Sequence, residues 1–338
     1  MRAYQLPKGG AGIDTIHQVE RPMPKPLYRQ VLVKVAACSL NYRDLVIARS
    51  DYRAPVRENV IPLSDGAGEV VEVGPGVLRV KVGDRVAGCF FQRWQGGTAS
   101  PQVLASTLGA GIDGMLTEYV ALEEDGVVKI PAHLSFEEAA SLPCAGVTAW
   151  NAIVEHGGLI AGQTLLVQGT GGVSIFGLQF ARAMGITVIV TSSSDEKLKR
   201  ARGLGAAHGI NYKTTPDWSK AALEFTGGEG VDLVIDVGGA ATLGPSLDAI
   251  RRGGKVSIIG VLSGPPAQIN AGRIFAKRAN VQGISVGSTQ MFEAMNAAIA
   301  ANNIKPVIDR VFPFEEAKGA YHHLAAAGHF GKVVIRVS

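Results

Sequence analysis

Three glycines that directly follow an apolar segment could bind phosphate. Residues 164–174 read TLLVQGTGGVS, in which Gly169, Gly171, Gly172 and Val173 form the predicted turn. Glycines let the backbone approach a pyrophosphate, and the free N–H groups at the start of the next helix stabilise its charge. Ser174 stands where the usual motif has a third glycine, so the motif alone is weak evidence for a dinucleotide site.

The surrounding sequence supports this interpretation. Apolar strands are predicted over 186–191, 208–212, 231–239 and 253–261, and they alternate with helices over 175–184, 195–205 and 217–225. This alternation is typical of βαβ units with a buried parallel sheet. The alternative is a glycine-rich turn in another kind of α/β domain.

The composition is that of a globular protein rather than a nucleic-acid-binding or membrane protein. The 338 residues are 46% hydrophobic and 18% charged, and the net charge of +4 is spread along the chain without a basic block. The N-terminus has no apolar signal region, and no apolar run reaches the roughly 18 residues that a membrane span needs. We therefore expect a cytoplasmic protein. Cys38, Cys89 and Cys144 lie far apart, which argues against a disulfide framework.

The first 130 residues have a different pattern, with period-two strands and turn residues. VLVKVAACSL (31–40) alternates, and AGEVVEVGPGVLRVKVGDRVAG (67–88) indicates short strands joined by Gly-Pro and Gly-Asp turns, as in a small β-barrel. From about residue 286 the sequence returns to a helix and a closing strand, GKVVIRV, which we expect to rejoin the first domain.

Taken together, VKVAACSLNYRD, IPLSDGAGEVVEVGPGV, SFEEAASLPCAGVTAW, VQGTGGVS and GKVVIRV resemble the medium-chain dehydrogenase/reductase superfamily, which contains zinc alcohol dehydrogenases and zinc-free quinone oxidoreductases. The resemblance runs from end to end. It implies an α/β fold with a GroES-like β-barrel catalytic domain (1–125 and 286–338), a doubly wound Rossmann domain (126–285), and an active cleft where they meet.

The sequence departs from the zinc-dependent branch of that family at two of three ligand positions. The resemblance places Asn41 where a cysteine is expected and Asp65-Gly66 where a His-Glu pair is expected, and it retains only Cys144. Zinc requires side chains such as thiolate and imidazole. We therefore predict no catalytic zinc, with Asp65 and Cys144 as remnants of a site, and no structural zinc, because residues 92–114 contain no cysteine.

The resemblance also suggests the catalytic residues. Tyr52 matches a tyrosine beside the nicotinamide in zinc-free quinone oxidoreductases, where a phenol could donate to a substrate oxygen; the alternative is an ordinary surface tyrosine. Asn41 could donate an amide N–H to the same oxygen, or could simply cap a helix. Asp44 matches an aspartate that orients its neighbours. Tyr42 and Arg43 stay unassigned.

NADP is the predicted cofactor, with NADPH preferred over NADH. NAD enzymes end the second strand with an acidic residue, whereas this chain has Ser192 there, followed by Lys197. The resemblance places Tyr212 beside the adenosine phosphate, Thr148 near the nicotinamide ribose and Lys332 at the pyrophosphate, and Gly260 completes the cofactor set. The alternative for the basic segment 195–202 is a solvated helix face.

These features predict a zinc-independent oxidoreductase that transfers hydride from NADPH to a conjugated carbonyl or a quinone. Such acceptors spread the developing charge over several atoms and need no Lewis acid. Two alternatives are an alcohol dehydrogenase with a residual metal site and a non-catalytic NADPH-binding protein. The family implies a homodimer or homotetramer. The substrate pocket is expected near Phe90, Phe91 and Trp94.

Overall fold

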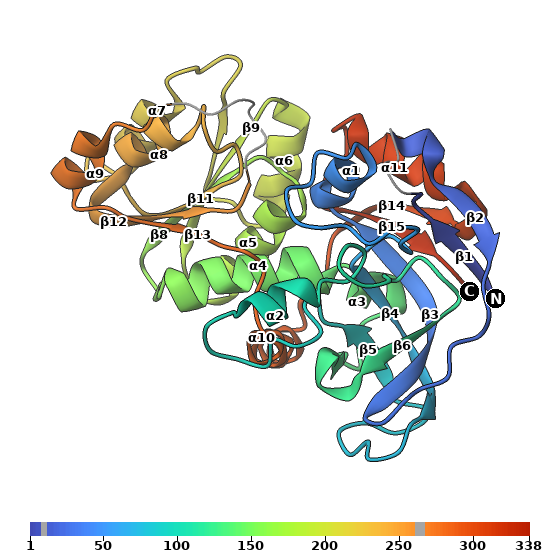
Figure 1. Ribbon diagram of the computed structural model, residues 1–338. Helices are drawn as coiled ribbons and strands as arrows, with labels where there is room; N and C mark the ends of the chain where they lie inside the picture. The colour runs from blue at the N-terminus through green and yellow to red at the C-terminus, as the bar shows by residue number, and fades with distance from the viewer. Residues whose placement is uncertain (8–11, 261–267) are drawn as a thin grey trace. The chain divides into compact units, whose positions relative to one another are not determined.

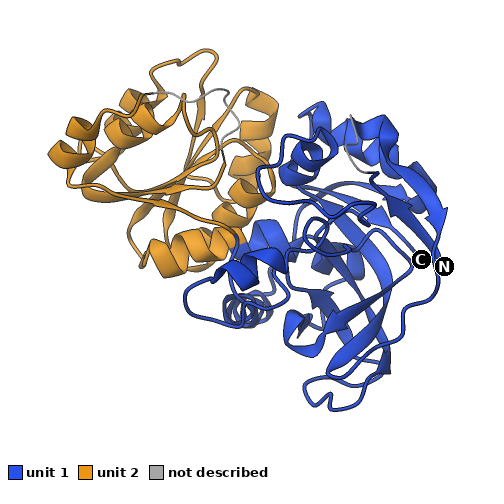
Figure 2. Cartoon of the chain, viewed as in Figure 1, with its two compact units in different colours: residues 1–147, 286–338 blue, residues 148–285 orange. Residues whose placement is uncertain are grey.

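The chain folds into two compact units (Figure 2), seen here in a computed structural model that describes residues 1–7, 12–260 and 268–338. Unit 1 consists of residues 1–147 and 286–338, and unit 2 consists of residues 148–285. The two ends of the chain fold together in unit 1, because strand β15 (Lys332–Arg336) pairs antiparallel with strand β3 (Gln30–Leu40).

Unit 1 is built on a seven-stranded sheet with the order β14-β15-β3-β4-β5-β7, in which β6 also pairs with β3. Its other strands are β4 (Asp65–Val73), β5 (Arg85–Gly88), β6 (Tyr119–Glu123), β7 (Val127–Lys129) and β14 (Ile308–Pro313). A separate antiparallel pair is formed by β1 (Arg2–Gln5) and β2 (His17–Glu20). Alternate residues of β3, namely Val31, Val33 and Val35, are buried in the core, as the period of two predicted.

The helices of unit 1 are α1 (Tyr42–Ala48), α2 (Pro101–Ala105), α3 (Phe136–Ala140), α10 (Thr289–Ala301) and α11 (Ala317–Ala325). After α3 the chain continues through a π-helical segment, Leu142–Gly146, and then through α4 (Val147–Trp150) and a second π-helical segment, Asn151–His156. π-Helical turns frequently lie at functional sites, and Cys144 lies in the first one.

Unit 2 contains a six-stranded sheet in which every strand pair is parallel (Figure 1). The strands are β8 (Thr164–Gln168), β9 (Thr187–Ser192), β10 (His208–Asn211), β11 (Val231–Asp236), β12 (Ile250–Ile258) and β13 (Asn280–Gly283). The helices are α5 (Gly172–Ala183), α6 (Asp195–Gly203), α7 (Trp218–Phe225), α8 (Leu243–Ala249) and α9 (Ala271–Lys277). The strands lie in the order β10-β9-β8-β11-β12-β13. From β8 the chain first adds strands on one side of the sheet (β9, β10) and then on the other (β11, β12, β13), so the switch point lies between β8 and β11. Doubly wound sheets bind ligands at this point.

This topology confirms the doubly wound parallel sheet that the sequence predicted. The first boundary between the units lies after Val147 rather than after residue 125, where we expected it. Residues 126–147 belong to unit 1 because β7 pairs with β5 and α3 packs against β3. The strand predicted over 253–261 ends at Ile258, and Val261 lies outside the described residues.

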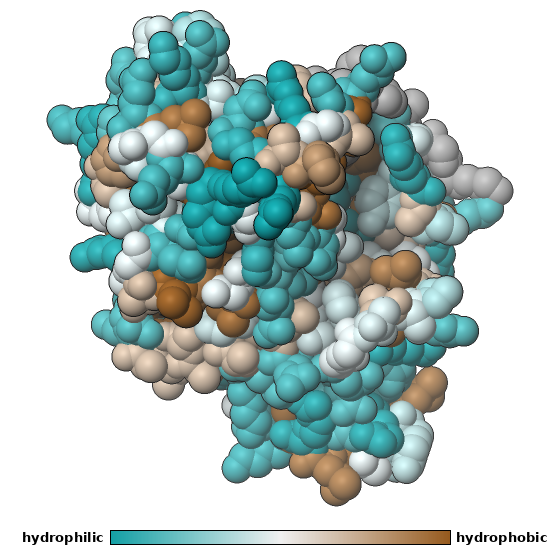
Figure 3. All heavy atoms as spheres, turned by 90° about the vertical axis from the view of Figure 1, so that its left-hand side faces the viewer, coloured by the Kyte–Doolittle hydropathy of each residue, from teal (hydrophilic) through white to brown (hydrophobic). Residues whose placement is uncertain are grey.

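Hydrophobic residues on the face shown in Figure 3 form separate patches among hydrophilic ones.

Within residues 1–7, 12–260 and 268–338, no helix combines the length and the apolar character that crossing a membrane requires.

Candidate active site

The predicted phosphate-binding turn follows β8, the strand at the switch point of the unit 2 sheet. Gly169 adopts a φ of 72°, a conformation that favours glycine, and its N–H donates to the carbonyl of Thr191 at 2.8 Å. Gly171 caps α5, and Gly172 and Val173 form its first turn, whose N–H groups have no partner within the helix. This arrangement suits an anionic phosphate group.

Ser174 replaces the third glycine of the usual motif without disturbing the turn. Its side chain is buried, and its hydroxyl donates to the carbonyl of Gln168 at 2.6 Å. The serine therefore ties the first turn of α5 to the end of β8.

The residues predicted to recognise the ribose phosphate lie at the ends of the two neighbouring strands. Ser192 ends β9 and is buried, and its carbonyl accepts from the N–H of Tyr212 at 3.0 Å, just after β10. Ser194 caps α6 by accepting from the N–H of Lys197 at 3.3 Å. The structure thus brings Gly169, Ser192 and Tyr212 to the carboxyl edge of one sheet, with Lys197 in the first turn of α6.

A buried polar network at the same edge was not identified from the sequence. The Asp236 carboxylate at the end of β11 accepts from the hydroxyls of Thr242 and Ser246, each at 2.6 Å. The Gln168 side chain donates to Asp236 at 3.2 Å and accepts from the N–H of Val237, also at 3.2 Å. Since these residues join β8 to β11, the network fixes the loop at the switch point.

The two remaining predicted cofactor residues of unit 2 are Gly260 and Thr148. Gly260 is half-buried and follows β12, whose carboxyl end lies at the same edge of the sheet. Thr148 is buried in α4, the first helix of the unit.

In unit 1, the predicted catalytic residues Asn41 and Asp44 lie at the start of α1. Asn41 is the N-cap of the helix and forms a capping box with Asp44: the Asn41 backbone N–H donates to the Asp44 carboxylate at 2.8 Å, and the Asn41 side chain accepts from the Asp44 backbone N–H. Asp44 is buried, and this burial raises its pKa from 3.8 to about 6. The carboxylate of Asp44 therefore contacts residue 41 directly.

Asp65 and Cys144 lie beside these residues although they are distant in sequence. Asp65 begins β4, and its carboxylate accepts from the Ser64 hydroxyl at 2.7 Å and from the backbone N–H of Cys144 at 3.1 Å. Burial raises the pKa of the Cys144 thiol, which therefore stays protonated at neutral pH.

Lys332 requires a correction. We expected its charge to reach the pyrophosphate, but its side chain is buried in unit 1, with 3% of its surface exposed. The ammonium donates to the Leu40 carbonyl at 2.7 Å and to Asn41 Oδ1 at 2.5 Å, and it lies 3.9 Å from Asp65 Oδ2. Lys332 therefore joins Asn41 and Asp65 in one buried group, to which we refer, with Cys144, as the 41–332 cluster.

Arg43, which the sequence left unassigned, links Asp44 to Tyr52. Its Nη1 donates to Asp44 Oδ1 at 3.4 Å. Its guanidinium lies 5.3 Å from the centroid of the Tyr52 ring and 4.7 Å from that of Phe90, both within the range of cation–π contacts. It also donates to the Leu108 carbonyl at 3.0 Å. Tyr52 is half-buried, and its ring packs against the Arg43 guanidinium. It is therefore not a free surface side chain.

The 41–332 cluster does not fit a zinc ion. Zinc is bound by thiolate, imidazole and carboxylate groups, whereas this cluster offers an amide, one thiol and one carboxylate that already faces an ammonium. Across the part of the chain that the structure describes, no group of three or more His, Cys, Asp or Glu residues could hold a metal.

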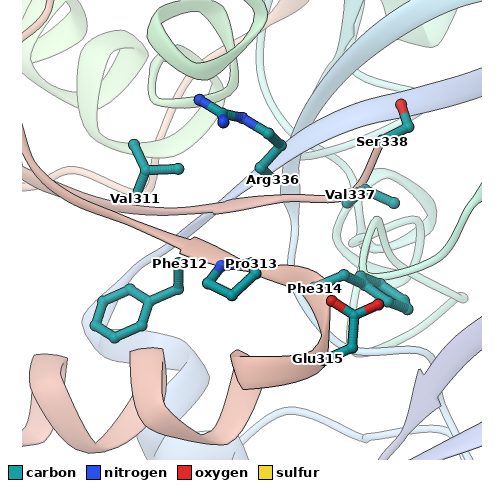
Figure 4. Close-up of a pocket in the computed structure, with 8 residues that line it drawn as sticks. All are labelled: Val311, Phe312, Pro313, Phe314, Glu315, Arg336, Val337 and Ser338. Atoms are coloured by element: carbon teal, nitrogen blue, oxygen red, sulfur yellow. The ribbon is translucent and has the colours of Figure 1, made fainter.

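A cavity of about 310 Å³ in unit 1 contains none of the candidate residues (Figure 4). Its charged lining groups are already paired, because Arg336 donates to Glu137 at 2.9 Å and Glu315 accepts from Arg2 at 2.7 Å. We therefore assign the chemistry to the residues described above rather than to this cavity.

Comparison with known protein families gives two matches. Residues 28–132 match the alcohol dehydrogenase GroES-like domain, and residues 172–301 match the family described as zinc-binding dehydrogenase. The first match confirms the predicted GroES-like domain. The second range contains none of Asn41, Asp65 and Cys144, so the name of that family does not bear on the 41–332 cluster.

Curated relatives match over nearly the whole chain. A zinc-type alcohol dehydrogenase-like protein of Schizosaccharomyces pombe is 45% identical and covers 97% of this chain and 96% of its own. A quinone oxidoreductase of Lama guanicoe is 28% identical and covers 99% of this chain and 97% of its own.

Solved structures agree in fold over the full length. An NAD-dependent alcohol dehydrogenase has a TM-score of 0.91 at 31% identity, and a mycobacterial protein complexed with NADPH has a TM-score of 0.84 at 26% identity; each covers 100% of both chains. The chain belongs to the medium-chain dehydrogenase/reductase superfamily and is an oxidoreductase of the alcohol dehydrogenase and quinone oxidoreductase type.

Proposed function

We propose that this protein transfers hydride from NADPH to a conjugated carbonyl compound or a quinone without a metal ion. The observation that carries the proposal is the chemistry of the 41–332 cluster: one expected ligand position holds the Asn41 amide, and another holds the Asp65 carboxylate, which already faces the Lys332 ammonium. An isolated ketone needs a Lewis acid to stabilise its developing alkoxide. A conjugated acceptor spreads that charge, so hydrogen-bond donors suffice.

Two donors of unit 1 are suited to the substrate oxygen. The Asn41 amide nitrogen Nδ2 is buried and has no hydrogen-bond partner among the described residues. Buried donors without a partner are rare and call for an explanation; here the missing partner is an oxygen of the substrate. Tyr52 supplies a phenol that donates a second hydrogen bond or, as the reaction ends, a proton. The bound NADPH supplies the hydride, and Asp44 orients Asn41.

NADPH is the proposed cofactor because unit 2 offers a hydroxyl rather than a carboxylate at the end of β9. A carboxylate at this position would accept hydrogen bonds from the ribose and repel a 2′-phosphate. Ser192 carries no charge that would repel the phosphate, and Lys197 lies in the first turn of the adjacent helix α6. The NADPH complex of the mycobacterial neighbour supports this choice. The likeness to an NAD-dependent alcohol dehydrogenase favours a second candidate, a dehydrogenase of simple alcohols that uses NAD.

One substrate screen separates the two candidates. Initial rates of NADPH and NADH oxidation are measured with a quinone, an enone, and the saturated ketone and aldehyde of matched size. The proposal predicts turnover of the quinone or the enone with NADPH and little turnover of the saturated compounds. Turnover confined to the saturated aldehyde with NADH would establish the second candidate. Binding of NADPH with no turnover of any acceptor would indicate a non-catalytic binding protein.

We also propose that the protein is a homodimer or homotetramer. The edge strand β13 is largely exposed, and Phe275 in the adjacent helix α9 is 86% exposed, so this edge of unit 2 offers backbone and apolar groups to a second copy. Light scattering after gel filtration measures the mass directly, and a monomer at all concentrations would refute the proposal.

A further inference from the structure

Lys332 carries a positive charge in the interior of unit 1, where an unpaired charge is unfavourable. Its side chain is 3% exposed, and the facing Asp65 side chain is fully buried. Burying an ammonium is unfavourable unless it is paired and hydrogen-bonded. The two oxygens at 2.5 and 2.7 Å and the carboxylate at 3.9 Å meet that requirement. Lys332 therefore occupies a site that is built for a cation.

The ammonium determines, together with helix α1, which way the Asn41 amide faces; in the capping box of α1 the Asn41 side chain accepts from the Asp44 backbone N–H. An asparagine side chain has one accepting oxygen and one donating nitrogen, and a lysine ammonium can only donate. The oxygen Oδ1 must therefore face Lys332, at 2.5 Å, and the nitrogen Nδ2 must face away. This nitrogen is one of the buried donors that have no hydrogen-bond partner among the described residues.

Asp65 completes the arrangement, because its carboxylate lies 3.9 Å from the Lys332 ammonium. Its carboxylate is held in turn by the Ser64 hydroxyl and the Cys144 backbone N–H. The order of contacts runs from Asp65 through Lys332 to Asn41 Oδ1. These contacts hold the ammonium against the amide oxygen, so the amide is set before any substrate binds.

We propose that Lys332 is a positioning residue, which presents the Nδ2 donor of Asn41 to the substrate oxygen and takes the place of the metal ion of zinc-dependent relatives. The inference rests on the proposed function for its substrate. Its structural part, the orientation of the amide by Lys332, stands independently and has its own measurement.

Steady-state kinetics test the role of Lys332 through a double-mutant cycle. Lys332→Met removes the charge and the donor, whereas Lys332→Gln keeps a donor for Asn41 Oδ1. We expect Lys332→Met to lower kcat with an enone about ten- to a hundredfold, which is the scale of losing one oriented donor, and to leave KM for NADPH nearly unchanged. Lys332→Gln should retain more activity than Lys332→Met. In an Asn41→Ala background, Lys332→Met should have little further effect.

Arg336→Met is the matched control, because it removes a cation from the same strand but outside the cluster. The control should leave kcat unchanged. Equal losses from Lys332→Met with and without Asn41 would overturn the proposal, since the lysine would then act on its own or through folding. If Lys332→Met does not fold, the same cycle run with Lys332→Gln decides the question, because that loss should also vanish in the Asn41→Ala background.

Nuclear magnetic resonance of ¹⁵N-asparagine-labelled protein tests the orientation without any turnover. The signal of the Asn41 side-chain amide is the one absent from Asn41→Ala. It should shift in Lys332→Met and in Lys332→Gln and stay in place in Arg336→Met. An unchanged signal in both Lys332 variants would overturn the positioning role even in an active enzyme, whereas a shifted signal in a protein that reduces no acceptor would leave the role intact and reject the proposed function instead.

Discussion

The phosphate-binding turn of unit 2 and the 41–332 cluster of unit 1 are built in different ways. The turn uses backbone N–H groups from one short segment after β8, and its main requirement is the conformation of Gly169. The cluster uses side chains that are separated by up to 291 positions, as in the contact between Lys332 and Asn41. A backbone site tolerates exchange of its side chains, as Ser174 shows, whereas a side-chain site changes its chemistry when one residue changes.

This difference predicts that the two regions can be damaged separately. Changes in unit 1 should lower turnover and leave NADPH affinity intact, and changes near the ribose site of unit 2 should do the reverse. The predictions below test that separation, beginning with the largest effect.

Tyr52→Phe should lower kcat about ten- to a thousandfold, because it removes a donor that meets the substrate oxygen as charge develops. NADPH affinity, measured by titration of protein fluorescence, should change little. Tyr42→Phe is the matched control, since Tyr42 lies at the start of α1 and is 46% exposed. If kcat is unchanged where chemistry limits the rate, Tyr52 has no part in the reaction.

Lys197→Glu should weaken NADPH binding about ten- to a hundredfold, because a charge-assisted hydrogen bond contributes roughly 1.5 to 3 kcal/mol and about 1.4 kcal/mol corresponds to a factor of ten. NADH binding and kcat at saturating cofactor should change much less. Lys199→Glu makes the same charge change two positions along α6, at an exposed residue. Equal weakening of both cofactors, or an equal effect of the control, would show that α6 acts only as a charged surface.

Asp44→Asn should change the pH dependence of stability. The unfolded carboxyl ionises near its ordinary pKa of 3.8, but in the folded protein burial raises that pKa to about 6. Between these values the folded state holds the extra proton, so this carboxyl makes unfolding easier as pH rises from 3.8 to about 6, by at most about 3 kcal/mol. Urea unfolding across this range should show that decline in the wild type and a flatter profile in Asp44→Asn. Parallel profiles would refute the raised pKa.

The sequence predicted much of unit 2 and less of unit 1. The alternation of strands and helices, the turn at Gly169 and the positions of Ser192 and Tyr212 follow from local patterns, because parallel strands bring their carboxyl ends to one edge. The network of Gln168 and Asp236 was missed, since its members look like ordinary strand ends and lie 68 positions apart.

In unit 1 the resemblance drew attention to Asn41, Asp44, Asp65 and Cys144, but it did not predict that Lys332 contacts Asn41 and faces Asp65. The register of β15 against β3, which pairs Val333 with Leu40, brings Lys332 to Asn41. No local pattern encodes that register. Arg43 was left unassigned for the same reason, because its aromatic neighbours Tyr52 and Phe90 come from separate loops.

The central claim is that an ammonium-centred cluster performs the task for which zinc-dependent relatives use a metal. Zinc content and the rate of NADPH oxidation with an enone, measured on the same sample before and after exhaustive chelation, test it most directly. We predict far less than one zinc per chain and an unchanged rate. One zinc per chain, with activity that is lost on chelation and restored by adding zinc, would contradict the account.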